Sequence, residues 1–153
     1  MVQHVVCMGG GFVGGPFGAM IAYQCPEVQV TVVDTNARRI EAWNSGYPPM
    51  YEPGLEEILA GIEQRTGDGD QSNLRFSTEI ERAIDDADII VLCVDTPTKT
   101  IGIGRDAAPD LSNLQAAVRT IAQVASTDKI VVEKSTVPCG TAELVRDLVL
   151  SCI

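Results

Sequence analysis

The sequence predicts an α/β fold in which helices cover both faces of a doubly wound parallel sheet. Short β-branched runs alternate with segments of helical periodicity, which is typical of βαβ units. The run over residues 89–94 is apolar at every position, as expected of a strand that is buried on both faces. A glycine-rich turn over residues 9–14 separates the first apolar run from the first helical segment. We therefore expect a three-layer αβα, Rossmann-type sheet with strand order 3-2-1-4-5.

The first half of the chain is predicted to hold two strands and three helices. The strands cover residues 5–8 and 28–33, and the first helix runs from the glycine turn to about residue 24. Asn36 carries a side chain suited to capping the second helix. A third helix follows Pro53 and Gly54, and the spacing of its apolar residues buries one face: Leu55, Ile58, Leu59 and Ile62.

The second half is predicted to hold three strands and three helices. The strands cover residues 74–76, 89–94 and 130–132, and a polar surface loop covers residues 67–73. Thr78 and Glu81 have the spacing of a capping box that begins a short helix. A long loop over residues 95–109 precedes a helix whose apolar face runs from residue 114 to residue 125. Pro138 suits the first turn of the last helix.

Composition narrows the classes of function. The 153 residues suit one domain, and 11 basic against 21 acidic residues give a net charge of −10, which disfavours nucleic acid as a partner. The longest apolar run is far shorter than the roughly 20 residues that cross a bilayer, so we expect no membrane segment. Five cysteines without a CxxC pair predict a reducing compartment, the cytoplasm. With His4 as the single histidine, we expect neither a histidine-based catalytic pair nor a metal site.

The glycine turn has the spacing Gly9-x-Gly11-x-x-Gly14 between a predicted strand and a predicted helix. In this fingerprint the first glycine permits a tight turn, the second lets the backbone approach a pyrophosphate, and the third lets the helix pack on the strand. Backbone N–H groups at the helix N-terminus then attract the anion. We predict that the turn binds the pyrophosphate of a dinucleotide.

Asp34 ends the second predicted strand, twenty positions after Gly14. A carboxylate here accepts hydrogen bonds from ribose hydroxyls and repels a 2′-phosphate, so NAD is favoured over NADP. Arg38 and Arg39 leave NADP as an alternative cofactor, because an arginine can pair with a 2′-phosphate. The Arg39 guanidinium can also lie over the adenine. The loops that follow the fourth and fifth strands, residues 94–98 and 135–138, are expected at the same sheet edge, near the ribose and nicotinamide.

Six stretches in the expected order match one family pattern: residues 9–16, 30–34, 42–45, 51–55, 96–100 and 133–138. The most specific are Tyr-Glu-Pro-Gly-Leu at residues 51–55 and Glu-Lys-Ser-Thr-Val-Pro at residues 133–138. On these motifs the chain resembles the UDP-glucose 6-dehydrogenases of eukaryotic type. That family oxidises the C6 alcohol of UDP-glucose to a carboxylate with two NAD+, through a cysteine thiohemiacetal and a thioester.

The resemblance implies roles for individual residues. Pyrophosphate contacts are implied at Gly11, Phe12, Val13 and Gly14, a ribose contact at Asp34 and an adenine contact at Arg39. Gly9, the first glycine of the turn, belongs to the same predicted cofactor-binding set. Further cofactor contacts are implied at Val94, Asp95, Thr96, Pro97, Thr98, Ser135, Thr136 and Val137. Thr136 also matches a threonine that helps to hold a catalytic water. UDP-glucose is the implied substrate, and the full-length enzyme is implied to be a homo-oligomer.

The chain also departs from the family pattern. Gly10 stands where a small residue such as alanine is usual, Asp95 replaces an asparagine, and the segment around residues 67–73 is longer than expected. The resemblance implies that the sixth strand, the substrate loop and the catalytic lysine and cysteine of the family lie outside residues 1–153. We therefore expect residues 1–153 to be an NAD-binding domain, inactive alone, without the central and C-terminal UDP-sugar-binding domains and with an exposed apolar sheet edge.

Two alternatives stay open from the sequence. The chain could come from a GDP-mannose or UDP-N-acetylhexosamine dehydrogenase, because these enzymes share the fold and their sugar specificity lies mostly in the other domains. It could also be a stand-alone NAD-binding module without chemistry of its own.

Overall fold

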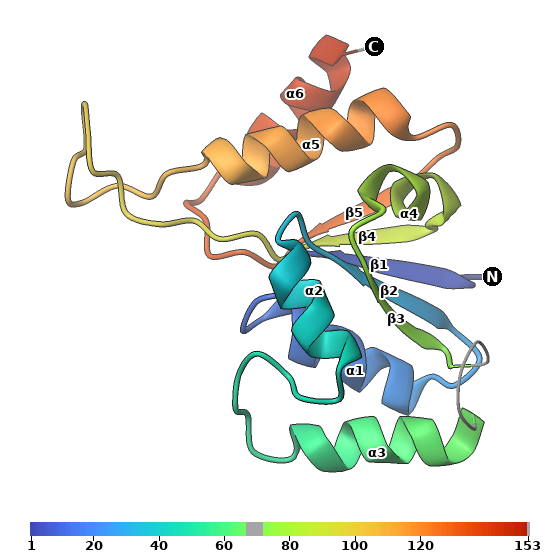
Figure 1. The fold of residues 1–153 in the computed structure, drawn as a ribbon. Helices are drawn as coiled ribbons and strands as arrows, with labels where there is room; N and C mark the ends of the chain where they lie inside the picture. The colour runs from blue at the N-terminus through green and yellow to red at the C-terminus, as the bar shows by residue number, and fades with distance from the viewer. Residues whose placement is uncertain (67–71, 153) are drawn as a thin grey trace.

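The computed structural model describes residues 1–66 and 72–152. Within them, five parallel strands form one sheet in the order β3-β2-β1-β4-β5. The strands are β1 (His4–Met8), β2 (Gln29–Val33), β3 (Leu74–Ser77), β4 (Ile89–Leu92) and β5 (Ile130–Glu133). This order and the layers in Figure 1 confirm the predicted Rossmann-type sheet. No helix in the described ranges is long and apolar enough to cross a membrane.

Helices cover both faces of the sheet (Figure 1). One core cluster joins the sheet to α1 (Gly14–Gln24), α3 (Leu55–Thr66) and Trp43 of α2 (Ala37–Asn44). The other joins it to α4 (Ile80–Asp86), α5 (Ser112–Val124) and α6 (Thr141–Cys152). Along β1, Val5 and Cys7 belong to the first cluster, whereas Val6 and Met8 belong to the second. Both faces of the central strand are therefore buried from Val5 to Met8, which explains why these four residues are all apolar.

The helix starts differ in part from the predictions. Asn36 caps α2 as predicted, since its side chain accepts a hydrogen bond from the Arg39 N–H at 3.2 Å. The predicted capping box for α4 is wrong, because Ser77 Oγ accepts the Glu79 N–H at 3.0 Å and the helix begins only at Ile80.

Pro138 does not lie in the first turn of the last helix, which corrects the prediction. Gly140 turns the chain with φ +85°, so α6 cannot begin before it and starts at Thr141. The Pro138 carbonyl instead accepts the Thr141 hydroxyl at 2.7 Å. Pro138 therefore belongs to the loop that leads into the helix.

The predicted polar surface loop falls mostly on residues 67–71, which lie outside the described residues. Its last residue, Asn73, is buried, so the prediction is wrong for this side chain. The Asn73 amide donates to the carbonyls of Ala22 at 2.9 Å and Val28 at 3.0 Å. It thereby satisfies a carbonyl at the end of α1 that the helix leaves without a partner.

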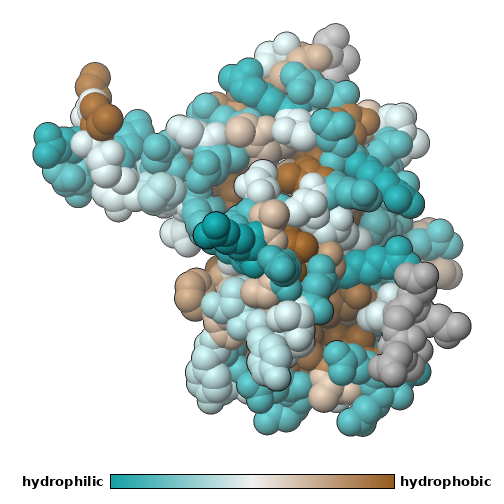
Figure 2. All heavy atoms as spheres, viewed as in Figure 1, coloured by the Kyte–Doolittle hydropathy of each residue, from teal (hydrophilic) through white to brown (hydrophobic). Residues whose placement is uncertain are grey.

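Two apolar features face solvent. Ile130 and Val132 of the edge strand β5 are 59% and 40% exposed, which confirms the expected apolar sheet edge. The loop between β4 and α5 projects from the body of the molecule (Figure 1), and Figure 2 shows hydrophobic atoms at its tip. Ile101 and Ile103 of this loop are 83% and 98% exposed.

Candidate dinucleotide-binding site

The glycine turn joins the carboxyl end of β1 directly to α1. Gly9 has φ +111°, and its N–H donates to the Val33 carbonyl at 2.7 Å, which ties the turn to β2. A Cβ on Gly9 would lie 2.5 Å from the Cys93 carbonyl oxygen, and one on Gly14 would lie 1.8 Å from the Gly9 carbonyl oxygen. Both positions therefore require glycine, and the turn is as tight as the fingerprint demands.

The start of α1 presents unused donors. Within the described ranges, no acceptor is bonded to the backbone N–H groups of Gly11, Phe12, Val13 and Gly14. A Cβ built on Gly11 would meet only Asp95 Oδ1, at 4.0 Å, so open space faces this residue. Free N–H groups at a helix N-terminus, beside space that a side chain would fill, fit the pyrophosphate of a dinucleotide.

Asp34 links the turn to β2 and α2. Its Oδ2 accepts the Gly10 N–H and Arg39 Nη1, both at 2.8 Å, and its Oδ1 accepts the Asn36 N–H at 2.8 Å. Burial alone would raise the pKa of Asp34, but the hydrogen bonds from Asn36, Arg39 and Gly10 outweigh it and hold the pKa below its ordinary value. The carboxylate is therefore ionised at neutral pH and is 7% exposed at the end of β2.

A cleft of about 380 Å³ opens between the glycine turn and the helices α4 and α5. The predicted site residues that line it are Gly9, Gly11, Asp34, Arg39, Val94 and Asp95. Arg39 is the only basic side chain among the lining residues in the part of the chain that the structure describes. Because Asp34, Glu81 and Asp95 are acidic, an anionic ligand here must rely on backbone donors and Arg39.

The sequence reasoning missed the walls that α4 and α5 contribute. Asn113, Ala116 and Thr120 of α5 line the cleft, as do Ile80 and Glu81 at the start of α4. The three α5 residues recur at positions i, i+3 and i+7, so they form one stripe on the helix. The sequence signal for this wall was the stripe of small and polar side chains. Such a stripe is also typical of a solvent-facing helix surface, so it does not by itself indicate a binding site.

The loops after β4 and β5 are hydrogen-bonded to each other. Ser135 Oγ donates to the Val94 carbonyl at 2.7 Å, and Thr96 Oγ1 donates to the Thr136 carbonyl at 2.8 Å. The two loops therefore lie side by side as expected, but both hydroxyls already donate their protons to a carbonyl of the opposite loop. Nine predicted site residues do not line the cleft: Phe12, Val13, Gly14, Thr96, Pro97, Thr98, Ser135, Thr136 and Val137.

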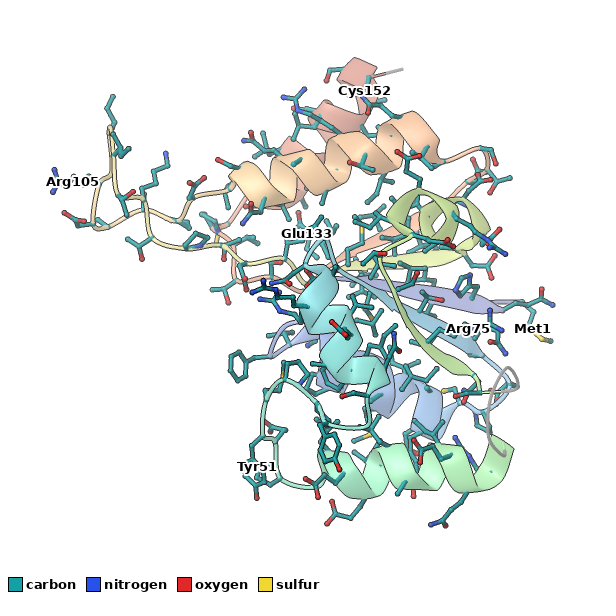
Figure 3. The ribbon with its side chains drawn as sticks, in the orientation of Figure 1. Met1, Tyr51, Arg75, Arg105, Glu133 and Cys152 are labelled. Carbon is teal, nitrogen blue, oxygen red and sulfur yellow. The ribbon has the colours of Figure 1, made fainter. Side chains whose placement is uncertain are left out.

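Of the other candidate reactive groups, Cys93 is buried in the wall of the cleft, whereas Cys139 and His4 do not line it. Cys139 is exposed on the loop before α6, and the single histidine, His4, bonds to Thr31 Oγ1 through Nε2 at 2.8 Å. Among the described residues, no group of three or more His, Cys, Asp and Glu could hold a metal ion. Figure 3 shows the side chains in place, with Glu133 at the carboxyl edge of the sheet and Tyr51 on the loop before α3.

Comparison with known proteins extends this picture. Residues 3–152 match the family model described as the UDP-glucose/GDP-mannose dehydrogenase family, NAD binding domain. A UDP-glucose 6-dehydrogenase from Caenorhabditis elegans is 52% identical over 142 residues, which cover 93% of this chain and 28% of that protein. UDP-glucose 6-dehydrogenase 1 from Oryza sativa subsp. japonica is 48% identical over 144 residues, or 94% and 28% of the two chains. The chain thus spans under a third of the length of these relatives.

Solved structures share the fold. A GDP-mannose dehydrogenase from Pseudomonas aeruginosa, crystallised as a ternary complex, superposes with a TM-score of 0.81 and 28% identity, covering 97% of this chain and 32% of that one. A UDP-glucose dehydrogenase from Pyrobaculum islandicum superposes with a TM-score of 0.80 and 29% identity, covering 99% and 33% of the two chains.

Proposed function

This chain belongs to the UDP-glucose/GDP-mannose dehydrogenase family as its NAD-binding domain, and we propose that it serves an enzyme that oxidises UDP-glucose to UDP-glucuronate. The observation that carries the proposal is the pairing of free N–H groups at the start of α1 with an ionised carboxylate at the end of β2. The relatives that are about half identical to this chain, each named UDP-glucose 6-dehydrogenase, support UDP-glucose as the sugar nucleotide.

We assign the cofactor contacts as follows. The N–H groups of Gly11, Phe12, Val13 and Gly14 bind the pyrophosphate, and Gly9 shapes the turn that presents them. Asp34 accepts hydrogen bonds from the adenosine ribose and repels a 2′-phosphate, which favours NAD over NADP. Arg39, whose Nη1 is held by Asp34 at 2.8 Å, is assigned to the adenine. NAD, when bound, supplies the hydride acceptor.

The joined loops after β4 and β5 are assigned to the nicotinamide half of the cofactor: Val94, Asp95, Thr96, Pro97, Thr98, Ser135, Thr136 and Val137. Their hydroxyls keep acceptor lone pairs after donating to carbonyls of the opposite loop. Thr136 is proposed to help hold the water that completes the second oxidation. The catalytic cysteine and the UDP-sugar-binding domains are proposed to lie in the remaining two thirds of the enzyme.

Assembly and location complete the proposal. The whole enzyme is proposed to be a cytoplasmic homo-oligomer that needs neither nucleic acid nor membrane. Exposed Ile101 and Ile103 on the projecting loop support an assembly that covers them.

The test uses the full-length product of the gene. We expect NADH formation with UDP-glucose at two NADH per sugar, and much lower kcat/KM with GDP-mannose or UDP-N-acetylmannosamine. A preference for either of these sugars would replace the substrate assignment. No oxidation of any sugar nucleotide, together with tight NAD+ binding, would favour a non-catalytic NAD-binding module instead.

A further inference from the structure

Trp43 lies on α2 where this helix passes the glycine turn, and it is 4% exposed. Its indole Nε1 donates to the Gly10 carbonyl at 2.9 Å. On the other side, the Gly10 N–H donates to Asp34 Oδ2 at 2.8 Å. The backbone of Gly10 is therefore fixed at both its N–H and its carbonyl group.

The Gly10 carbonyl belongs to the same peptide unit as the Gly11 N–H. A trans peptide is planar, so its carbonyl and its N–H point in opposite directions. By holding the carbonyl, the indole fixes where the Gly11 N–H points. That N–H is one of the free donors at the open side of the turn.

The indole is itself fixed by packing. A Cβ on Gly15 would lie 2.1 Å from Trp43 Cζ2, so the ring lies directly against the first turn of α1. Phe76 of β3 stacks on it, with ring centroids 4.6 Å apart and planes inclined by 5°. The indole N–H is thus a donor of fixed direction rather than a mobile side chain.

Glycines flank the peptide unit on both sides, and glycine offers little resistance to backbone rotation. A peptide flip between Gly10 and Gly11 would aim a carbonyl oxygen at the open side of the turn, where an anion is expected. The bond to Trp43 opposes this flip, because the flip would leave the buried indole N–H without an acceptor and facing the Gly11 N–H, which is also a donor.

From this geometry we propose that Trp43 is a positioning residue, which aims the Gly11 N–H and so raises affinity for the pyrophosphate rather than for the adenosine of the cofactor. The inference rests on the proposed cofactor site and adds a residue to it that does not line the cleft. Trp43 acts on the ligand through the backbone of Gly10.

The first test is Trp43→Phe, which keeps an aromatic ring against Phe76 and removes the donor. We expect the Kd for NAD+ and for ADP to rise about five- to tenfold, as for one lost hydrogen bond, while the Kd for adenosine stays unchanged. Phe76→Leu is the matched control, because it loosens the same ring stack and leaves the indole donor in place. It should change the ratio of NAD+ to adenosine affinity much less than Trp43→Phe does, because the hydrogen bond to Gly10 and the packing against Gly15 remain.

Calorimetry for NAD+ and ADP, and chemical-shift titration for adenosine, give these constants. Equal weakening of NAD+ and adenosine binding, or an unchanged Kd for NAD+, would overturn the role of Trp43. A wild-type chain that binds no NAD+ would instead overturn the proposed function, so the two failures are distinguishable.

A second test needs no variant. Trp43 is the only tryptophan of the chain, so its indole gives a single ¹⁵N–¹H resonance. NAD+ and ADP should shift this resonance and slow its exchange with solvent, and adenosine should do so much less. An indole resonance that NAD+ leaves unmoved at saturation contradicts the proposal.

Discussion

Asp34 is assigned two roles, recognition of the cofactor ribose and support of the fold, and Asp34→Ala tests both through cofactor affinity and the free energy of unfolding. The carboxylate is ionised and 7% exposed, and it accepts hydrogen bonds from Gly10, Asn36 and Arg39. Alanine leaves two backbone N–H groups and one guanidinium without this partner. Hydrogen bonds to a charged group are worth about 1.5–3 kcal/mol each, and removing one partner of a buried ion pair costs about 3–5 kcal/mol, so we expect the free energy of unfolding to fall by at least about 3 kcal/mol.

Because Gly10 is freed at the same time, the affinity for NAD+ and the affinity for NADP+ should both fall. Their ratio isolates the repulsion between Asp34 and a 2′-phosphate. Two unit charges about 4 Å apart interact by about 1 kcal/mol in water and about 4 kcal/mol near a protein surface. Arg39 offsets part of the Asp34 charge, so we take the lower value, which corresponds to a narrowing of the NAD/NADP ratio of at least about fivefold.

Calorimetric titration with both cofactors measures the ratio, and urea unfolding measures the stability. Asn36→Ala is the matched control, since it removes the α2 cap at a cost of about 1 kcal/mol and should leave the ratio unchanged. An unchanged NAD/NADP ratio in Asp34→Ala refutes the assignment of Asp34 to the ribose site.

Three further predictions use features particular to this chain. Gly10→Ala should raise the free energy of unfolding by about 0.4–1 kcal/mol in urea titrations, because alanine lowers the conformational entropy of the unfolded chain. A Cβ at this position would meet Asp34 and Trp43 at ordinary contact distances of 3.5 and 3.6 Å. A lower free energy of unfolding would show that the turn cannot hold alanine. Asp95→Asn should lower the Kd for NAD+ about fivefold at low salt, because it removes a negative charge beside Gly11. Equal Kd values for the variant and the wild type would show that the Asp95 carboxylate lies too far from the pyrophosphate to repel it. Ile130→Lys combined with Val132→Thr should reduce self-association of the chain, measured by sedimentation velocity, because the exposed apolar edge of β5 can pair with a second copy. A wild-type chain that is monomeric at every concentration would contradict this pairing.

The fold was predictable because local patterns and topology agree. The alternation of apolar runs with helical periodicity predicted each strand of the sheet, and the glycine spacing with Asp34 predicted where β1 and β2 end near one another. Parallel strands place their carboxyl ends at one edge, so the cleft position followed without knowledge of side-chain contacts.

The rest depended on tertiary contacts that spacing does not encode. Trp43 looks like any core residue of an amphipathic helix, and its bond to the Gly10 carbonyl joins positions 33 residues apart. Asn73 looks like a loop residue until the end of α1 is placed beside it. Pro138 satisfied a rule for helix starts, but the positive φ of Gly140 moved the start to Thr141.

Calorimetric titration of this chain with NAD+, NADP+ and UDP-glucose tests the central claim most directly. The site described here predicts measurable binding of NAD+, weaker binding of NADP+ and almost no binding of UDP-glucose. Tight binding of UDP-glucose, or the absence of NAD+ binding by the folded chain, would contradict it.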